Sequence, residues 1–274
     1  MGIRINTNVS SLTTQRHLYN STVSFGKSME KLASGLRINR AADDAAGLAI
    51  SEGIKSDIRA LGQAARNAGD AISMVQTAEG ALDEVSNILL RMKELSEQSM
   101  GGTLSGTQQD HLQSEYAELM AEIDRISAGT EYNGISLLDG SLAVDIQVGV
   151  DTAATSSINV TLATAMDTTG LALAAGIGQA GAPGTAMAEV DAAISAVSTA
   201  RAGLGAKQNR FESSIRNINN QSENLSAANS RIRDVDVANE TSRMTSFQIL
   251  QQAGVSVLSQ ANMTTGLAMS LLQG

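Results

Sequence analysis

The sequence predicts a mainly α-helical protein, a long antiparallel coiled-coil helical bundle with a small β-hairpin region at its tip. Apolar residues recur at spacings of three and four from Met187 to Ile232, the pattern of helices that wrap around each other. The 274 residues contain only one proline, the residue that most strongly breaks helices. Aromatic residues make up 2% of the chain, which suits helical seams of Ala, Leu, Ile and Val better than a globular enzyme core.

The longest predicted helix, residues 187–232, needs partners of similar length. At about 1.5 Å per residue it forms a rod of roughly 70 Å, and a lone rod cannot bury its apolar stripe. A heptad pattern over 54–98, with one slip, predicts a second long helix. Gly101-Gly102 marks a turn, and a third helix is expected over 112–126, ended by Gly129.

Residues 140–184 change character. Two runs alternate apolar and other residues: Val144, Ile146, Val148 and Val150, then Ile158, Val160 and Leu162. Alternation with a period of two predicts strands, so we expect a β-hairpin over about 140–165. A Gly-, Ala- and Thr-rich loop over 166–184 follows, and Thr185 is a candidate cap of the last long helix.

Helices are also predicted at both ends of the chain, each separated from the rods by a short break. The first break, residues 34–53, contains Asp43 and Asp44, either of which can cap the next helix. A metal site is the alternative interpretation of this pair, but no other ligand lies nearby in the sequence. The second break is Arg233-Asp234-Val235-Asp236.

These breaks divide the chain into two regions. Residues 1–44 and 234–274 form the terminal helices, and residues 45–233 form a rod domain that contains the hairpin and the loop. The layout is nearly symmetric about the hairpin, so an antiparallel bundle would bring the two chain ends together.

Charge is placed unevenly along the chain. The net charge of −9 argues against nucleic-acid binding, which needs concentrated Lys and Arg. Residues 1–29 contain no acidic residue, and residues 244–274 contain no charged residue at all. No continuous apolar run marks a secretory signal or a membrane span, so we expect neither.

The charge-free C-terminal segment predicts burial among copies of the same chain. A helix that lies on a membrane usually carries Lys or Arg on its polar face, and this one has only Gln, Ser, Thr and Asn there. A secreted membrane-active coiled coil is therefore a weaker alternative. An assembly protein whose two termini form the inner wall of a polymer fits better. The candidate inner-wall contacts are Leu12, Phe25, Phe247, Leu250, Val257, Ala261 and Leu271.

The motifs for chemistry are weak. Residues 176–181 satisfy G-x-G-x-x-G, but a dinucleotide site needs a preceding strand and a helix that opens at the motif. We interpret the motif as a flexible glycine loop and keep a nucleotide-binding enzyme as the alternative. His17 and His111 lie far apart in sequence, and there is no cysteine. We therefore expect no catalytic residue, no cofactor and no metal.

Several stretches resemble bacterial flagellin. They include LASGLRINRAADDAAGLAI at residues 32–50, TAEGAL at 77–82, EIDRI at 122–126, YNG at 132–134 and the ending QAN at 260–262. The resemblance covers about residues 1–165 and 185–274. It implies a secreted structural subunit of the extracellular flagellar filament, in a minimal form with core domains only. A related alternative is a hook–filament junction protein.

The resemblance also implies partners. The chain would form a helical homopolymer, be exported by a type III apparatus, and meet the filament cap and hook-junction proteins. An export chaperone would hold the C-terminal segment.

A vertebrate innate immune receptor is a further possible partner, through positions that match Arg91, Leu95 and Glu115. The neighbouring Lys93 and Glu97 depart from the stimulating pattern. For Leu95 the alternative is a residue packed inside the rod.

Overall fold

The computed structural model describes residues 7–151 and 153–273, apart from the side chains of residue 154 and of residues from 265 on. The chain contains two compact units. One comprises Asp57–Glu223, and the other joins the segment up to Ser56 with the segment from Asn224 on. The predicted division at residues 44 and 234 lies instead at the breaks between helices, and it remains a prediction.

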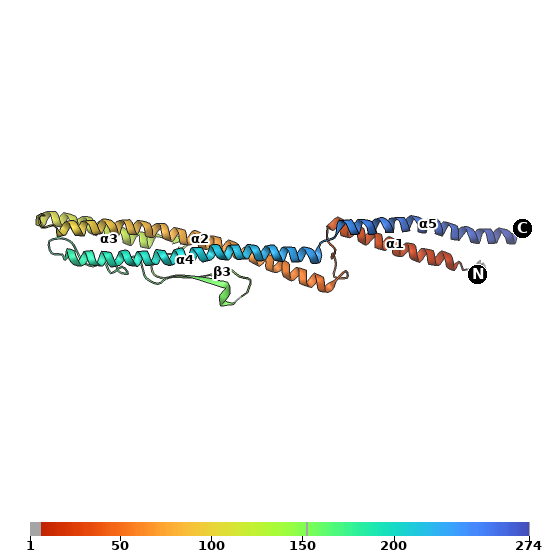
Figure 1. The fold of residues 1–274 in the computed structure, drawn as a ribbon, viewed down its shortest axis with the longest axis horizontal. Helices are drawn as coiled ribbons and strands as arrows, with labels where there is room; N and C mark the ends of the chain where they lie inside the picture. Colours follow the sequence, from red (N-terminus) through yellow and green to blue (C-terminus); the bar gives the residue numbers. More distant parts are fainter. Residues whose placement is uncertain (1–6, 152, 274) are drawn as a thin grey trace. The chain divides into compact units, whose positions relative to one another are not determined.

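Three long helices build the first unit (Figure 1): α2 (Ala45–Met100), α3 (Gly106–Gly129) and α4 (Pro183–Arg233). Two ion pairs join α2 to α4, from Lys93 to Asp191 at 2.6 Å and from Arg201 to Asp83 at 3.0 Å. Residue numbers fall by ten along α2 as they rise by ten along α4, so the two helices are antiparallel. The predicted helical class is confirmed.

The seam of α4 follows the predicted heptad. Its buried positions repeat every seven residues over most of the helix: Val190, Val197, Leu204, Phe211 and Ile218. The helix begins at Pro183, two residues before the predicted cap Thr185. That cap was wrong because proline, with no N–H to satisfy, is itself well suited to the first turn of a helix.

The break before α2 holds the paired aspartates, and each has a structural role. Asp44 Oδ1 accepts a hydrogen bond from the Gly47 amide at 2.9 Å. This bond confirms Asp44 as the cap of α2. Asp43 instead accepts bonds from the amides of Arg40 and Asn39, and these bonds lower the pKa of its carboxyl.

The strands form two antiparallel hairpins. The pair β3 (Leu142–Gln147) and β4 (Ser157–Leu162) confirms the predicted hairpin, with the short 3-10 helix η1 (Ala154–Ser156) in its connection. A smaller pair, β1 (Glu131–Tyr132) and β2 (Ile135–Ser136), was not predicted. Its turn has positive φ at Asn133 (52°) and Gly134 (77°), as an Asn-Gly hairpin turn requires.

The larger hairpin does not lie at the tip of the rod, and that part of the prediction was wrong. Asn67 of α2 donates a hydrogen bond to the Gln147 carbonyl at 3.2 Å, and Lys207 of α4 donates one to the Asn159 carbonyl at 2.8 Å. Asn67 lies about 50 Å along α2 from its end at Met100. The strands lie there because their apolar face, which includes buried Val160, needs helices to cover it.

In the second unit, α1 (Val9–Ser34) packs along α5 (Val237–Gln273). Asn8 caps α1, and Gly35 ends it in the left-handed conformation (φ 71°). An isolated antiparallel bridge then joins Leu36 to Asp234. The two breaks predicted from the sequence therefore pair with each other.

Candidate assembly surface on the terminal helices

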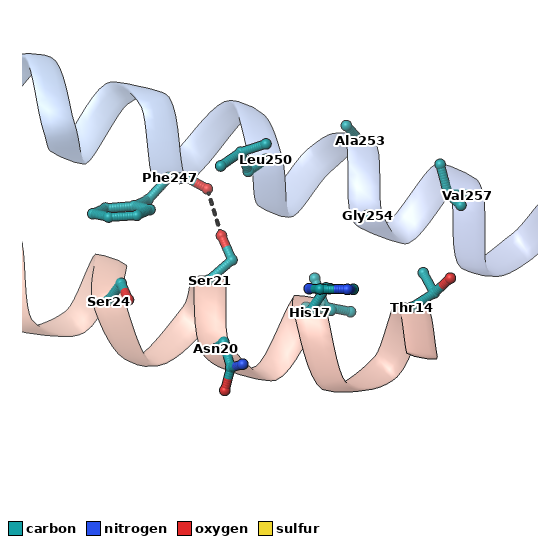
Figure 2. Close-up of a pocket in the computed structure, with 11 residues that line it drawn as sticks. Thr14, His17, Asn20, Ser21, Ser24, Phe247, Leu250, Ala253, Gly254 and Val257 are labelled. Carbon is teal, nitrogen blue, oxygen red and sulfur yellow. Dashed lines mark hydrogen bonds between the residues drawn. The ribbon is translucent and has the colours of Figure 1, made fainter. Parts of the chain in front are cut away.

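Small and polar groups take part in the contact between helices α1 and α5. The Ser21 hydroxyl donates to the Phe247 carbonyl at 3.1 Å (Figure 2), and the Asn8 amide donates to the Ala261 carbonyl at 2.8 Å. A Cβ atom at Gly254 would lie 3.3 Å from Leu18 Cδ1, so the missing side chain permits this close approach. Residue numbers run in opposite directions across these contacts, and the pair is antiparallel.

Exposed large apolar side chains are concentrated on this helix pair. Eleven of the sixteen exposed large apolar side chains in the described part of the chain lie on α1 and α5. They are Val9, Leu12, Tyr19, Val23, Met29, Val237, Ile249, Leu250, Val255, Val257 and Met263. Soluble monomers rarely expose this much apolar surface in one region, and such surfaces mark interaction sites.

A groove runs along one side of the pair and encloses about 530 Å³. Its apolar wall belongs to α5, and its polar wall belongs largely to α1, as Figure 2 shows. The α5 residues are Phe247, Leu250, Ala253, Gly254 and Val257, and the polar α1 residues are Thr14, His17, Asn20, Ser21 and Ser24. Between Met244 and Thr264, α5 carries no charged residue, so a partner could cover its wall without burying an α5 charge.

The predicted inner-wall residues divide into two groups. Leu12, Leu250 and Val257 are each more than half exposed and remain free for another molecule. Phe25, Phe247 and Ala261 are partly covered within the chain. The side chain of Leu271 lies outside the described residues.

The prediction from the sequence did not include several exposed residues of this surface, such as Tyr19 and Ile249. Their signal was present: apolar residues occur on every side of α5, as in a helix that is buried all round. The predicted contacts on α5 came from a single apolar seam, so residues on its other faces were not included.

The candidate receptor residues lie on α2 and α3. Leu95 is fully buried in the rod, so the alternative of a packed rod residue is confirmed. Arg91 and Glu115 are exposed and paired, with Nη2 2.8 Å from Glu115 Oε1. The bond to Glu115, and a second to Glu94, raise the pKa of Arg91.

The glycine motif at 176–181 is a packed segment, and its interpretation as a flexible loop was wrong. Gln113 Oε1 accepts hydrogen bonds from the amides of Ile177 and Gly178 at 2.5 and 3.0 Å, and the Ile177 side chain is fully buried. Glu189 binds the preceding amides of Ala174 and Ala175 in the same way. Amides that are already paired cannot bind phosphate, and α4 begins only at Pro183.

The described residues offer neither a metal-binding cluster nor a membrane-spanning helix. No group of three His, Cys, Asp or Glu side chains there could hold a metal ion. No helix over 7–151 and 153–273 combines the length and apolar character that a membrane span requires.

Paired terminal helices with uncovered apolar faces, attached to a helical rod, define a self-assembling structural protein. The family described as the bacterial flagellin N-terminal helical region matches residues 5–143, and the bacterial flagellin C-terminal helical region matches residues 187–272. This chain belongs to the bacterial flagellin family.

Individual relatives extend over nearly the whole chain. A flagellin of Halalkalibacterium halodurans is 45% identical, over 98% of this chain and 99% of its own. The flagellar filament 33 kDa core protein of Treponema phagedenis is 42% identical, over 98% and 99%. The crystal structure of Bacillus cereus flagellin has a TM-score of 0.50 at 33% identity, over 60% of this chain and 94% of that one.

Proposed function

We propose that this chain is a structural subunit of the extracellular flagellar filament, with α1 and α5 as the contacts that build the polymer. The observation that carries the proposal is the uncovered apolar surface of these two helices. The printed names of the relatives, flagellin and flagellar filament core protein, point to the same role. The role is structural, with no catalysis and no cofactor.

The size of the apolar surface supports assembly. Fully burying a large apolar side chain is worth about 1.5–3 kcal/mol, and eleven such side chains on α1 and α5 are roughly half exposed. Covering them would contribute on the order of 10 kcal/mol per copy, against an association cost of about 4–15 kcal/mol. A single contact is therefore marginal, and contacts to several neighbours at once would make a stable polymer.

Helix α5 is also the surface on which we place the export chaperone. Before assembly its apolar faces have no polymer partner, and a chaperone that covers them would prevent premature association. The cap and hook-junction proteins would meet the same faces at the ends of the filament.

Recognition by a vertebrate receptor is a finer proposal about the rod. It would rest on exposed Arg91 and Glu115, which are already bonded to each other. Leu95 would support this surface from inside the rod.

Electron microscopy of the purified chain after ammonium sulfate seeding tests the main proposal. The comparison is a chain that ends at Arg243, which lacks the charge-free segment. We expect filaments from the full chain only. A full chain that stays monomeric but folded, by circular dichroism, would favour the hook–filament junction protein, and filaments from the shortened chain would refute the role of α5.

A further inference from the structure

The groove between α1 and α5 has two chemically different walls, and an occupant must satisfy both. The α5 wall is apolar and needs apolar contact. On the α1 wall the hydroxyls of Thr14 and Ser21 are already bonded within the chain. The side chains of His17, Asn20 and Ser24 make no hydrogen bond to any residue that the structure describes. A purely aliphatic occupant would bury these polar groups unpaired, which is costly.

Helix α1 presents a second surface that matches this requirement. Leu12, Tyr19 and Val23 are separated by seven and four residues and therefore share one face. They are 57%, 70% and 42% exposed, on a side of α1 that does not contact α5. Tyr19 has an aromatic ring for an apolar wall and a hydroxyl for a polar one. The exposed side chains of α5 outside the groove, Ile249, Val255 and Met263, have no such polar end.

We propose that the groove of one copy receives the Leu12–Tyr19–Val23 face of α1 from a second copy. This rests on the proposed function, because the second copy is the neighbouring subunit of the polymer. The ring of Tyr19 packs against the Leu250 and Val257 wall, and its hydroxyl bonds to the polar wall. Arg16 lies on the same α1 face, and residues 7–29 contain no acid to pair with it. The oxygens of Asn20 and Ser24 in the groove can accept its hydrogen bonds.

The geometry of the two surfaces determines what they build. Groove and face lie on different sides of one helix pair, so each copy offers one of each. Such a contact is heterologous, so it continues from copy to copy and builds an open helical polymer wherever the rotation between copies does not close into a ring. A contact of groove to groove, or of face to face, would stop at a dimer.

Disulfide trapping tests this pairing on a clean background, because the chain has no cysteine. The test chains carry Tyr19→Cys with Leu250→Cys, or Tyr19→Cys with Val257→Cys, since the two groove positions sample two registers. Oxidised polymers of at least one pair should give a ladder of covalent oligomers on non-reducing gels. Tyr19→Cys with Val255→Cys is the matched control, since Val255 is similarly exposed but does not line the groove. Each single variant should give dimers at most.

A second measurement tests the pairing even if the cysteine variants fail to polymerise. Tyr19 is largely exposed, so Tyr19→Ala should leave the monomer folded while raising the critical concentration on the order of thirtyfold, as for an interface anchor. Tyr19→Phe, which keeps the ring, should raise it only about fivefold. Filaments without a ladder from either test pair, a ladder from the control pair alone, or an unchanged critical concentration would overturn the pairing. If the unmodified chain forms no filaments, the proposed function fails first and the pairing with it.

Discussion

Leu95 is expected to hold the rod together. It is fully buried in α2, while Leu90, five residues earlier in the same helix, is 50% exposed. Replacing a buried leucine by alanine removes apolar contacts and leaves a cavity, at a cost of about 2–5 kcal/mol. The same replacement at an exposed site usually changes stability by about 0.5 kcal/mol or less. Leu95→Ala and Leu90→Ala are therefore a matched pair that differs chiefly in burial.

The assay is urea unfolding of the monomer, followed by far-ultraviolet circular dichroism. Leu95→Ala should lower the free energy of unfolding by about 2–5 kcal/mol. In thermal unfolding the same loss would lower Tm by roughly 4–20 °C for a unit of this size. Leu90→Ala should stay close to the unmodified chain. If the two variants unfold within about 0.5 kcal/mol of each other, Leu95 does not act as a seam residue. If Leu95→Ala also weakens a receptor response, the response should return under conditions that restore the stability of the rod.

Three further predictions follow from particular residues. The Tyr116 hydroxyl is buried with no hydrogen-bond partner among the described residues, and burial, followed by the charge of Glu189, raises its pKa to about 12. Because the folded chain holds this proton more tightly than the unfolded chain, the group leaves stability unchanged with pH below its ordinary pKa of 10 and lowers the free energy of unfolding as the pH rises from 10 toward 12. Tyr116→Phe should thus be neutral or stabilising at pH 7, and it should remove the loss of stability at high pH. A large destabilisation at pH 7 in urea unfolding would instead show that the hydroxyl has a hydrogen-bond partner. Leu250→Asp and Val257→Asp should leave the monomer folded but stop polymerisation, because a charge would be buried at a repeated contact; normal filaments in electron microscopy would contradict the placement of α5 inside the polymer. Backbone amides of residues 244–264 should exchange hydrogen more slowly in the filament than in the monomer, and equal protection in both forms would show that assembly does not stabilise α5.

The helical elements were predictable because their signals are local and repeated. The seven-residue period of α4 survives in its buried positions from Val190 to Ile218. The cap at Asp44 and the β3–β4 hairpin were likewise readable from neighbouring residues. The β1–β2 hairpin was missed although Asn133-Gly134 is a strong turn signal, because strands of two residues are too short to show alternation.

Long-range contacts were not predictable from one sequence. Gln113 binds the amides of residues 64 and 65 positions away, and this contact turns an apparent glycine loop into packed structure. The position of the larger hairpin depends on Asn67 and Lys207, neither of which belongs to a local strand signal.

The sequence by itself determined that this protein is a set of long helices with charge-free ends, since periodicity and composition act within a few turns of helix. It also carried the motifs of the flagellin family. Only the tertiary structure decided which apolar residues are covered and which remain free. Leu95 and Leu250 both lie on apolar stripes, yet one is fully buried and the other is 57% exposed. The physical reason is that burial depends on the partner helix: α2 has partners within its own rod, whereas the described part of α5 packs chiefly along α1.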